Sequence, residues 1–320
     1  MKEQILQYLM LHADGYVSGA ELATELQVSR NTIWKTIQQL KDAGYQIESQ
    51  HRVGYRYRGG NVLNATTIKQ GLQTDIAVQV FNTIDSTNKF AKNLAVTAPT
   101  KPVAIIANEQ TAGYGRQGRA YYSPADDGLY LSLLLPMHDE RLNSGLLTTG
   151  VATAVADTLA KLYHVQPQIK WVNDVIVNQH KVVGIMTEGI ADLESGTLSH
   201  VIIGIGLNLT NVEFPTELSQ KVGSLGLADV DRNQLATQLL NALLTLVTTY
   251  QTATFMARYR ELSLVIGQEV TLSRYGTEIS GRVTDIADDG ALILNTKDGA
   301  QSFTSGEITK VNILNGEYHG

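Results

Sequence analysis

The first 58 residues carry a pattern of apolar and polar positions that predicts three helices followed by a β-hairpin. Apolar residues recur at helical spacing in the first helix at Ile5, Leu6 and Leu9, and in the third helix at Ile33, Ile37 and Leu40. The run Ser18-Gly-Ala-Glu21 has the capping-box pattern that begins a helix, and Ser29 is the expected N-cap of the third helix. Residues 47–58 alternate around a turn near residues 52–54, which predicts the hairpin.

Residues 59–61, Gly-Gly-Asn, form a natural boundary, and the pattern changes after them. Up to about residue 265, strand-like and helical runs alternate. The strand-like runs are residues 103–107, 129–135 and 200–207 with a hairpin over 170–188, and the helical runs are residues 144–162 and 232–250. This alternation predicts an α/β or α+β body built on a mixed sheet.

The last segment, from about residue 267, changes character again. Short alternating runs at residues 269–272, 279–283 and 291–294 are separated by Asp-Gly turns at residues 289–290 and 298–299. This spacing predicts a small SH3-like β-barrel. The predicted fold class is therefore multidomain α+β, with a winged helix-turn-helix over residues 1–60, a central mixed-sheet domain over 61–265 and a C-terminal barrel over 266–320.

Composition excludes several classes of protein. The chain of 320 residues is 43% hydrophobic and 18% charged, and no apolar run approaches the roughly 20 residues that span a membrane. With no cysteine, disulfides, thiolate zinc sites and cysteine nucleophiles are excluded, and the seven histidines lack metal-binding spacing, so we expect no protein-held metal. The first residues lack the apolar core of a signal peptide, and we expect a cytoplasmic protein without a membrane partner.

Charge is distributed unevenly. The net charge of −6 argues against non-specific binding of nucleic acid over the whole surface, yet residues 29–58 hold six basic and two acidic residues, a local charge of +4. A basic second helix of a helix-turn-helix can lie in a major groove, and a basic wing can reach phosphates. The candidate DNA-binding residues are Arg30, Asn31, Lys35 and Gln38 on the helix, and Arg52 and Arg56 on the wing. Trp34 could stack on a base, but its spacing beside Ile33 and Ile37 is more typical of a core residue.

Residues 109–124, EQTAGYGRQGRAYYSP, contain the spacing G-x-G-x-x-G at Gly113, Gly115 and Gly118. A strand-like run precedes them, but proline and Asp-Gly punctuation and then a second strand-like run follow, so a dinucleotide-binding fold is rejected. Arg116 and Arg119 change the interpretation, because glycine backbone and guanidinium groups together can hold phosphate or carboxylate. A solvated surface loop is the alternative. Residues 113–119 are called the glycine loop below.

Four further stretches favour a ligand site. They are Asp85-Ser-Thr-Asn88, Lys170-Trp-Val-Asn-Asp174, His180-Lys-Val-Val-Gly184 and Gly204-Ile-Gly-Leu-Asn208. Each alone is more typical of scaffold, and the first is also a plain helix N-cap. Together with the glycine loop they make a purely structural role improbable.

These five stretches, in this order and spacing, resemble the bifunctional biotin–protein ligases that double as biotin operon repressors, the BirA type, over all three segments. The resemblance implies a winged helix that binds operator DNA and a central biotin/lipoate ligase-like domain that makes biotinyl-5′-AMP from biotin and ATP. It also implies transfer of biotin to a lysine of a biotin carboxyl carrier protein, as in acetyl-CoA carboxylase. The small C-terminal domain would assist with ATP and acceptor protein.

The same resemblance assigns roles to single residues. The biotin-binding residues would be Ser86, Thr87, Asn88, Gln110, Gly113, Tyr114, Gly115, Arg116, Lys181 and Gly184. The ATP-binding residues would be Arg116, Arg119, Lys170, Asn173, Asp174 and Asn208. Arg116, Lys181 and Asp174 would be catalytic. Two positions depart from the family pattern: Tyr114 stands where an arginine is common, and Val172 stands where proline is frequent.

We also expect Mg²⁺ bound to the ATP phosphates, and a homodimer promoted by ligand. Two other interpretations stay open at this point. One is a repressor that senses a metabolite without catalysis, and the other is a lipoate–protein ligase, which runs the same adenylation. A protein kinase is excluded, because the His-Arg-Asp and Asp-Phe-Gly motifs are missing from the sequence.

Overall fold

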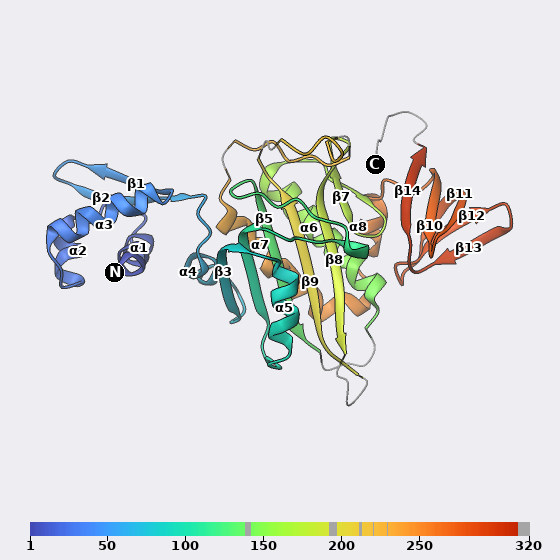
Figure 1. Ribbon diagram of the computed structural model, residues 1–320, viewed down its shortest axis with the longest axis horizontal. Coiled ribbons are helices and arrows are strands. Elements are labelled where there is room, and N and C mark those ends of the chain that lie inside the picture. Colours follow the sequence, from blue (N-terminus) through green and yellow to red (C-terminus); the bar gives the residue numbers. More distant parts are fainter. Residues whose placement is uncertain (138–141, 192–196, 211–212, 220, 229, 313–320) are drawn as a thin grey trace.

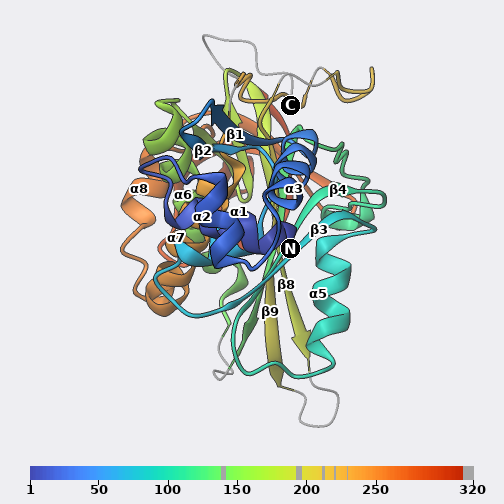
Figure 2. The ribbon, with the colours of Figure 1, turned by 90° about the vertical axis from the view of Figure 1, so that its left-hand side faces the viewer.

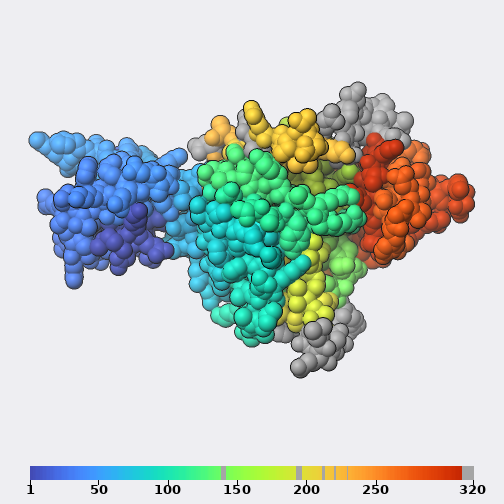
Figure 3. Space-filling view, viewed as in Figure 1, coloured from blue at the N-terminus to red at the C-terminus, as the bar shows by residue number. Residues whose placement is uncertain are grey.

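Three bodies follow one another along the longest axis of the molecule, with the N-terminal body and the C-terminal β-sheet at opposite ends (Figure 1). The computed structural model describes residues 1–137, 142–191, 197–210, 213–219, 221–228 and 230–312. Figure 3 shows the middle body as the largest, joined to the N-terminal body across a narrower neck. The final part of the predicted third domain, residues 313–320, lies outside the described residues.

The N-terminal body is a three-helix unit with a hairpin, as predicted. Its elements are α1 (Lys2–Leu11), α2 (Gly19–Glu25), α3 (Arg30–Asp42), β1 (Tyr45–Gln50) and β2 (Gly54–Gly60). The hydroxyls of Ser18 and Ser29 accept hydrogen bonds from the backbone N–H groups of Glu21 and Thr32, each at 3.0 Å, so both predicted N-caps are confirmed. The six apolar residues predicted for the first and third helices are buried together in one core.

The central body is built on a seven-stranded mixed sheet, which confirms the predicted class. Its strands are β3 (Ala77–Ile84), β4 (Val103–Gln110), β5 (Gly128–Pro136), β6 (Gln168–Lys170), β7 (Asp174–Val177), β8 (His180–Ala191) and β9 (Leu198–Asn208). They lie in the order β3-β4-β5-β9-β8-β7-β6, where β3 and β4 are parallel and the remaining neighbours are antiparallel.

Helices cover both faces of this sheet. They are α4 (Ala65–Gln70), α5 (Thr87–Ala95), α6 (Ser144–Tyr163), α7 (Arg232–Thr249) and α8 (Met256–Glu261). Figure 2 shows α5 on one side of the sheet and α6, α7 and α8 on the other. Alternate residues of β4 serve the two cores, because Ile105 packs with the α5 side and Ile106 packs with the α6 side.

The loop between β4 and β5 joins strand to strand, as predicted, and the structure shows that these two strands are antiparallel. The structure describes this loop in full, and its helical content is one 3-10 turn, Arg116–Gly118. There is accordingly no α-helix N-terminus for a dinucleotide pyrophosphate in this described loop, which agrees with the rejection of that fold.

The C-terminal body is an antiparallel β-domain of five strands, in the order β13-β12-β11-β10-β14. The strands are β10 (Glu269–Arg274), β11 (Thr277–Ile286), β12 (Leu292–Thr296), β13 (Gly299–Phe303) and β14 (Glu307–Asn312). The tight turns predicted near residues 289–290 and 298–299 lie beside β12, where Gly290 and Gly299 have positive φ. No helix among the described residues has the length and apolar character needed to cross a membrane.

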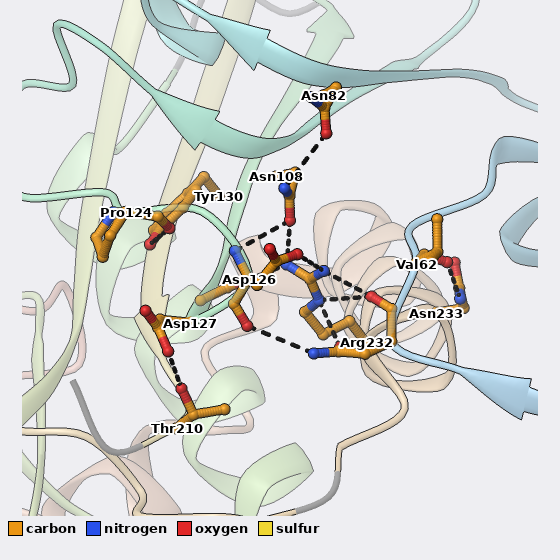
Figure 4. A network of polar contacts seen from close by, with 12 residues as sticks. Val62, Asn82, Asn108, Pro124, Asp126, Asp127, Tyr130, Thr210, Arg232 and Asn233 are labelled. Atoms are coloured by element: carbon orange, nitrogen blue, oxygen red, sulfur yellow. Dashed lines mark hydrogen bonds and ion pairs between the residues drawn. The ribbon is translucent and has the colours of Figure 1, made fainter. Parts of the chain in front are cut away.

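A buried arginine fixes the linker between the first two bodies (Figure 4). Arg232, at the start of α7, is only 1% exposed, and its guanidinium donates to the carbonyl of Asn61 at 2.6 Å and to Asn108 Oδ1 at 2.6 Å. The next residue, Asn233, donates from Nδ2 to the carbonyl of Val62 at 2.8 Å. Because a buried cation is costly without partners, these bonds hold the chain at residues 61–62 against the central body.

Candidate active site

A cavity of about 230 Å³ opens at the ends of the central strands, under the glycine loop and beside the C-terminal body. Its lining comes from segments far apart in the chain. These are the start of α5, the end of β4, the glycine loop, the turn between β6 and β7, and parts of β8, β9 and β14. Such a cavity, with polar groups converging from many elements, has the character of a small-molecule site.

Hydroxyl and amide groups form one side of the cavity. Gln110 Oε1 accepts from the backbone N–H of Thr87 at 2.9 Å and from its hydroxyl at 3.1 Å. Gln110 Nε2 donates to the Ser123 hydroxyl at 3.0 Å. The Ser132 hydroxyl lies 2.8 Å from Thr87 Oγ1 and 2.5 Å from Asn88 Oδ1. These contacts fix the directions in which the buried polar groups face the cavity.

The carboxylate of Glu188, on β8, lies beside this polar side. Its Oε2 accepts from Asn88 Nδ2 and from the Tyr114 hydroxyl, both at 3.3 Å, and its Oε1 lies 2.7 Å from Lys92 Nζ. Lys92 Nζ also lies 5.2 Å from the centre of the Tyr114 ring. Burial tends to lower the pKa of Lys92, but hydrogen bonds with Glu188 and Tyr114 outweigh it and raise that pKa. We call Asn88, Lys92, Tyr114 and Glu188 the Glu188 cluster.

Two glycines on β9 allow side chains to approach the sheet closely. A Cβ added at Gly204 would lie 2.3 Å from Asn88 Oδ1, and one added at Gly206 would lie 2.4 Å from the Tyr121 ring. The hydroxyl of Tyr121 is buried and has no hydrogen-bond partner among the described residues. Burial raises its pKa well above the usual value, so it stays protonated and can donate to a ligand.

Cations and a carboxylate form the other side of the cavity. Lys181 Nζ pairs with Asp174 Oδ1 at 2.7 Å. Asn173 Nδ2 donates to the carbonyl of Ile185 at 2.7 Å, which fixes the turn that carries Asp174. The Trp171–Val172 peptide bond in this turn is cis. Burial lowers the pKa of Lys170, although the carboxylate of Asp174 opposes that shift.

The two arginines of the glycine loop reach the C-terminal body. Arg116 donates to Asn173 Oδ1 at 3.1 Å and to the carbonyl of Gly306 at 2.9 Å. Arg119 forms a forked ion pair with the carboxylate of Glu307, at the start of β14. The glycine loop therefore bridges the central sheet and the C-terminal strand, and it brings Arg116 to the cavity.

The structure brings the predicted central residues to one place. The cavity is lined by Ser86, Thr87, Asn88, Gln110, Tyr114, Gly115, Arg116, Arg119, Lys170, Asn173, Asp174, Lys181, Gly184 and Asn208. Gly113 is buried at the base of the loop rather than among the lining residues; a Cβ there would lie 2.8 Å from the Ser123 hydroxyl. The ligand roles of these residues stay predictions.

Sequence reasoning missed several residues at the site. Ser132 and Glu188 lie in runs whose pattern predicts strands and gives no sign of a ligand site. Glu307 lies in the C-terminal body, outside the central domain. Phe214 lines the cavity from the segment after β9 and packs edge-on to Tyr122, with ring centroids 6.2 Å apart. A possible signal for Glu188 was its single charge in an otherwise uncharged run, residues 182–191.

The predicted DNA-binding residues lie in the N-terminal body, outside this cavity. Arg30, Asn31 and Lys35 are exposed on α3, and Arg52 is exposed at the tip of the wing. Gln38 is half-buried, and so is Arg56, whose Nε donates to the carbonyl of Ala13 at 3.0 Å. The expectation that Trp34 belongs to the core was wrong: its side chain is 52% exposed, because Ile33 and Ile37 fill the core on the other side of the helix.

Across the ranges that the structure describes, no group of three or more His, Asp or Glu residues is arranged to hold a metal ion. The carboxylate of Asp174 and the oxygen-rich phosphates of a nucleotide would suit Mg²⁺, which prefers oxygen ligands and commonly keeps several waters.

Each of the three bodies is similar to a known protein family. The family model "Biotin/lipoate A/B protein ligase family" matches residues 80–208, "HTH domain" matches residues 2–56, and "Biotin protein ligase C terminal domain" matches residues 265–311. A biotin protein ligase from Aquifex aeolicus, solved in complex with biotin and ATP, is similar in fold, with a TM-score of 0.64 and 26% identity. That similarity covers 73% of this chain and 98% of the Aquifex chain.

Two curated relatives match almost from end to end. The bifunctional ligase/repressor BirA of Bacillus spizizenii is 30% identical over 320 residues, covering 96% of this chain and 98% of that protein. The protein of the same name from Escherichia coli is 30% identical over 313 residues, covering 95% and 96%. The chain therefore belongs to the family of bifunctional ligase/repressor proteins, with an HTH domain, a biotin/lipoate ligase domain and a biotin protein ligase C-terminal domain in one polypeptide.

Proposed function

We propose that this protein is a biotin–[acetyl-CoA-carboxylase] ligase that also represses transcription in response to biotin. In the first reaction, a carboxylate oxygen of biotin attacks the α-phosphorus of ATP, forming biotinyl-5′-AMP and releasing pyrophosphate. The carboxylate is already ionised at neutral pH, so no general base is needed. Catalysis is then mainly positioning of the reactants and stabilisation of charge.

The proposed roles of the site residues follow from the chemistry of their side chains. Ser86, Thr87 and Asn88 would hydrogen-bond the ureido ring of biotin, and Gln110 would lie near its carboxylate end. The backbone of Gly113 and Gly115, with Tyr114 and Gly184, would enclose the molecule. Arg116 and Lys181 would face the reacting carboxylate and the α-phosphate. Arg119, Lys170, Asn173, Asp174 and Asn208 would lie on the ATP side.

In the second reaction, the amine of an acceptor lysine attacks the acyl carbon of the adenylate and AMP leaves. The acceptor would be the biotin carboxyl carrier domain of a carboxylase. The amine must be neutral to attack, and Asp174 is our candidate to accept its proton. Mg²⁺ would enter with ATP and neutralise charge between its phosphates.

One observation supports the ligase function most strongly. Arg116 and Lys181 line the same cavity as the polar side chains of Thr87 and Asn88. The uncharged polar side chains suit the polar ring of a small acid. The two cations beside them suit the carboxylate of that acid and the phosphate to which it is joined. The nearly full-length similarity to bifunctional ligase/repressors supports the same function.

The ligase function is tested by incubating the protein with ATP, Mg²⁺ and labelled biotin, and by measuring exchange of pyrophosphate into ATP. We expect biotin-dependent exchange and a labelled acyl-adenylate that stays with the protein. Exchange that requires lipoate and ignores biotin would instead support a lipoate ligase. Tight biotin binding without any exchange would support a catalytically inactive sensor.

Regulation forms a second part of this proposal. The three units would be residues 1–60, which bind operator DNA, residues 61–265 and residues 266–320. A chain that binds operator DNA must reach the chromosome, so we place it in the cytoplasm. Ligand would favour a homodimer able to span two half-sites, and the two equilibria would then influence each other reciprocally. Ultracentrifugation with and without biotin and ATP tests this; unchanged self-association would remove the dimer from the scheme.

A further inference from the structure

Glu188 receives donors from two separate parts of the site. Asn88 and Lys92 belong to α5, whereas Tyr114 belongs to the glycine loop. The Glu188 side chain is only 18% exposed, so its contacts are largely shielded from water. A shielded carboxylate with these donors holds them more firmly than an exposed ion pair would.

The same carboxylate determines which way the Asn88 amide faces. A carboxylate is an acceptor without a donor, so Asn88 must present its Nδ2 to Glu188. Its Oδ1 then faces the hydroxyl of Ser132, on β5, at 2.5 Å. With Nδ2 and Oδ1 assigned in this way, Asn88 offers a defined pattern of polar atoms to a ligand.

Hydrogen bonds connect this amide to the glycine loop and to the segment that follows it. In the loop, the Tyr114 hydroxyl donates to Glu188. After the loop, Ser123 accepts from Gln110, which also accepts from Thr87. A continuous series of contacts therefore runs through Ser123, Gln110, Thr87, Ser132, Asn88, Glu188 and Tyr114.

We propose that Glu188 is a positioning residue that couples closure of the glycine loop over biotin to the orientation of Asn88, through the hydroxyl of Tyr114. The coupling needs a donor at position 114, and in this chain the phenol takes the place of a charged side chain. Lys92 balances the charge of Glu188 and lies over the ring of Tyr114. This inference rests on the biotin ligase function proposed above.

Coupling of this kind acts on retention of biotin rather than on the phosphoryl chemistry. In the Tyr114→Phe variant the ring beneath Lys92 is kept, but the hydrogen bonds of the hydroxyl with Glu188 and Lys92 are lost. We expect biotin to dissociate about tenfold faster, with a similar rise in KM for biotin, because a hydrogen bond to a charged acceptor has been removed. The kcat at saturating biotin should change by less than about twofold.

The matched control is Tyr163→Phe, which removes a tyrosine hydroxyl from the end of α6, away from the cavity lining. Glu188→Gln should also speed dissociation, and Tyr114→Phe should add less than about twofold in the Glu188→Gln background. As a second readout, trypsin should cut after Arg116 and Arg119 faster in both variants than in the wild-type chain when biotin is saturating. A variant that is merely destabilised would not separate KM from kcat in this way.

The outcomes are distinguishable. Wild-type protein that fails to bind biotin would overturn the proposed function itself. Wild-type protein that binds biotin, while Tyr114→Phe releases it at the wild-type rate, would overturn the role of the Glu188 cluster. Independent, multiplicative effects of the two substitutions would also overturn it, because the tyrosine and the carboxylate would then not act through each other.

Discussion

Arg119 and Glu307 join the glycine loop to the C-terminal body through a forked ion pair, although 188 residues separate them in the chain. The Nη2–Oε2 distance is 2.7 Å, and Glu307 is the more buried partner. Both side chains also line the cavity. The C-terminal β-domain is thus in direct contact with the loop that is proposed to cover the substrates.

Glu307→Ala should weaken binding of ATP. Without the carboxylate, Arg119 loses its anchor on β14 and the loop loses one of its attachments. Since the pair is partly exposed, we expect a loss of about 1 kcal/mol, or roughly a fivefold rise in KM for ATP. Steady-state kinetics of pyrophosphate exchange measure this. Glu278→Ala, on an exposed site of β11, serves as control; equal effects of the two substitutions would contradict the assignment.

The same pair predicts a pH dependence. Hydrogen bonding to Arg119 lowers the pKa of Glu307 below its ordinary value near 4.5, although burial acts in the opposite direction. A depressed folded-state pKa means that the pair contributes stability fully above pH 4.5 and loses it as pH falls through the lowered pKa. Chemical denaturation measured from pH 6 down to about pH 3 should therefore show a smaller pH-dependent loss in Glu307→Gln than in the wild-type chain. Parallel profiles would contradict it.

Lys181→Ala and Arg116→Ala should each reduce adenylate formation by about two orders of magnitude or more, because each removes a cation from the developing charge. Circular dichroism should show that the N-terminal helices stay folded. Lys161→Ala, an exposed lysine in the last turn of α6, is the matched control. Near-normal pyrophosphate release from either cavity variant would defeat the assignment.

Arg232→Met should destabilise the central body by about 3 kcal/mol, because it leaves buried carbonyl and amide oxygens without their donor. Urea denaturation followed by far-UV circular dichroism measures the loss. Arg258→Met removes an arginine that is 44% exposed and should change stability by less than about 0.5 kcal/mol. Similar losses in both variants would argue against a special role for the buried guanidinium.

Trp34→Ala should lower affinity for operator DNA while leaving ligation unchanged, since the exposed indole lies on the helix proposed to enter the major groove. Lys35→Ala should reduce the slope of log affinity against log salt by about 1, as expected for one phosphate contact. Gel-shift titrations at several salt concentrations give both quantities. An unchanged affinity in Trp34→Ala would assign the indole to a different contact.

Local patterns in the sequence were sufficient for the N-terminal body. Ser18 and Ser29 cap the helices where expected, and Ile33 and Ile37 are buried, because capping and helical spacing are local properties. Trp34 shows the limit of this reasoning. Its neighbours are apolar at helical spacing, but which direction becomes the interior depends on the packing of all three helices.

The candidate site was predictable where chemistry-bearing residues cluster in the chain, as around Arg116 and Asp174. Their meeting in one cavity could not be derived from spacing, because it depends on strand order in the sheet. Glu188 and Glu307 were missed for the same reason: each is the single acidic residue of its strand, and the partners Tyr114 and Arg119 lie 74 and 188 residues away in the sequence. Long-range pairing of this kind leaves no periodic signal.

The buried guanidinium of Arg232 also limits how the two activities can be separated. Two of its acceptors, the carbonyl and side-chain oxygens of Asn61, belong to the linker that follows the N-terminal body. An enzyme shortened by removing the N-terminal body would therefore have to begin before Asn61. Otherwise Arg232 would have to be replaced by an uncharged residue. The N-terminal and central bodies thus share a piece of backbone, so shortening this polypeptide to the enzyme alone would require a compensating substitution in the core of the part that remains.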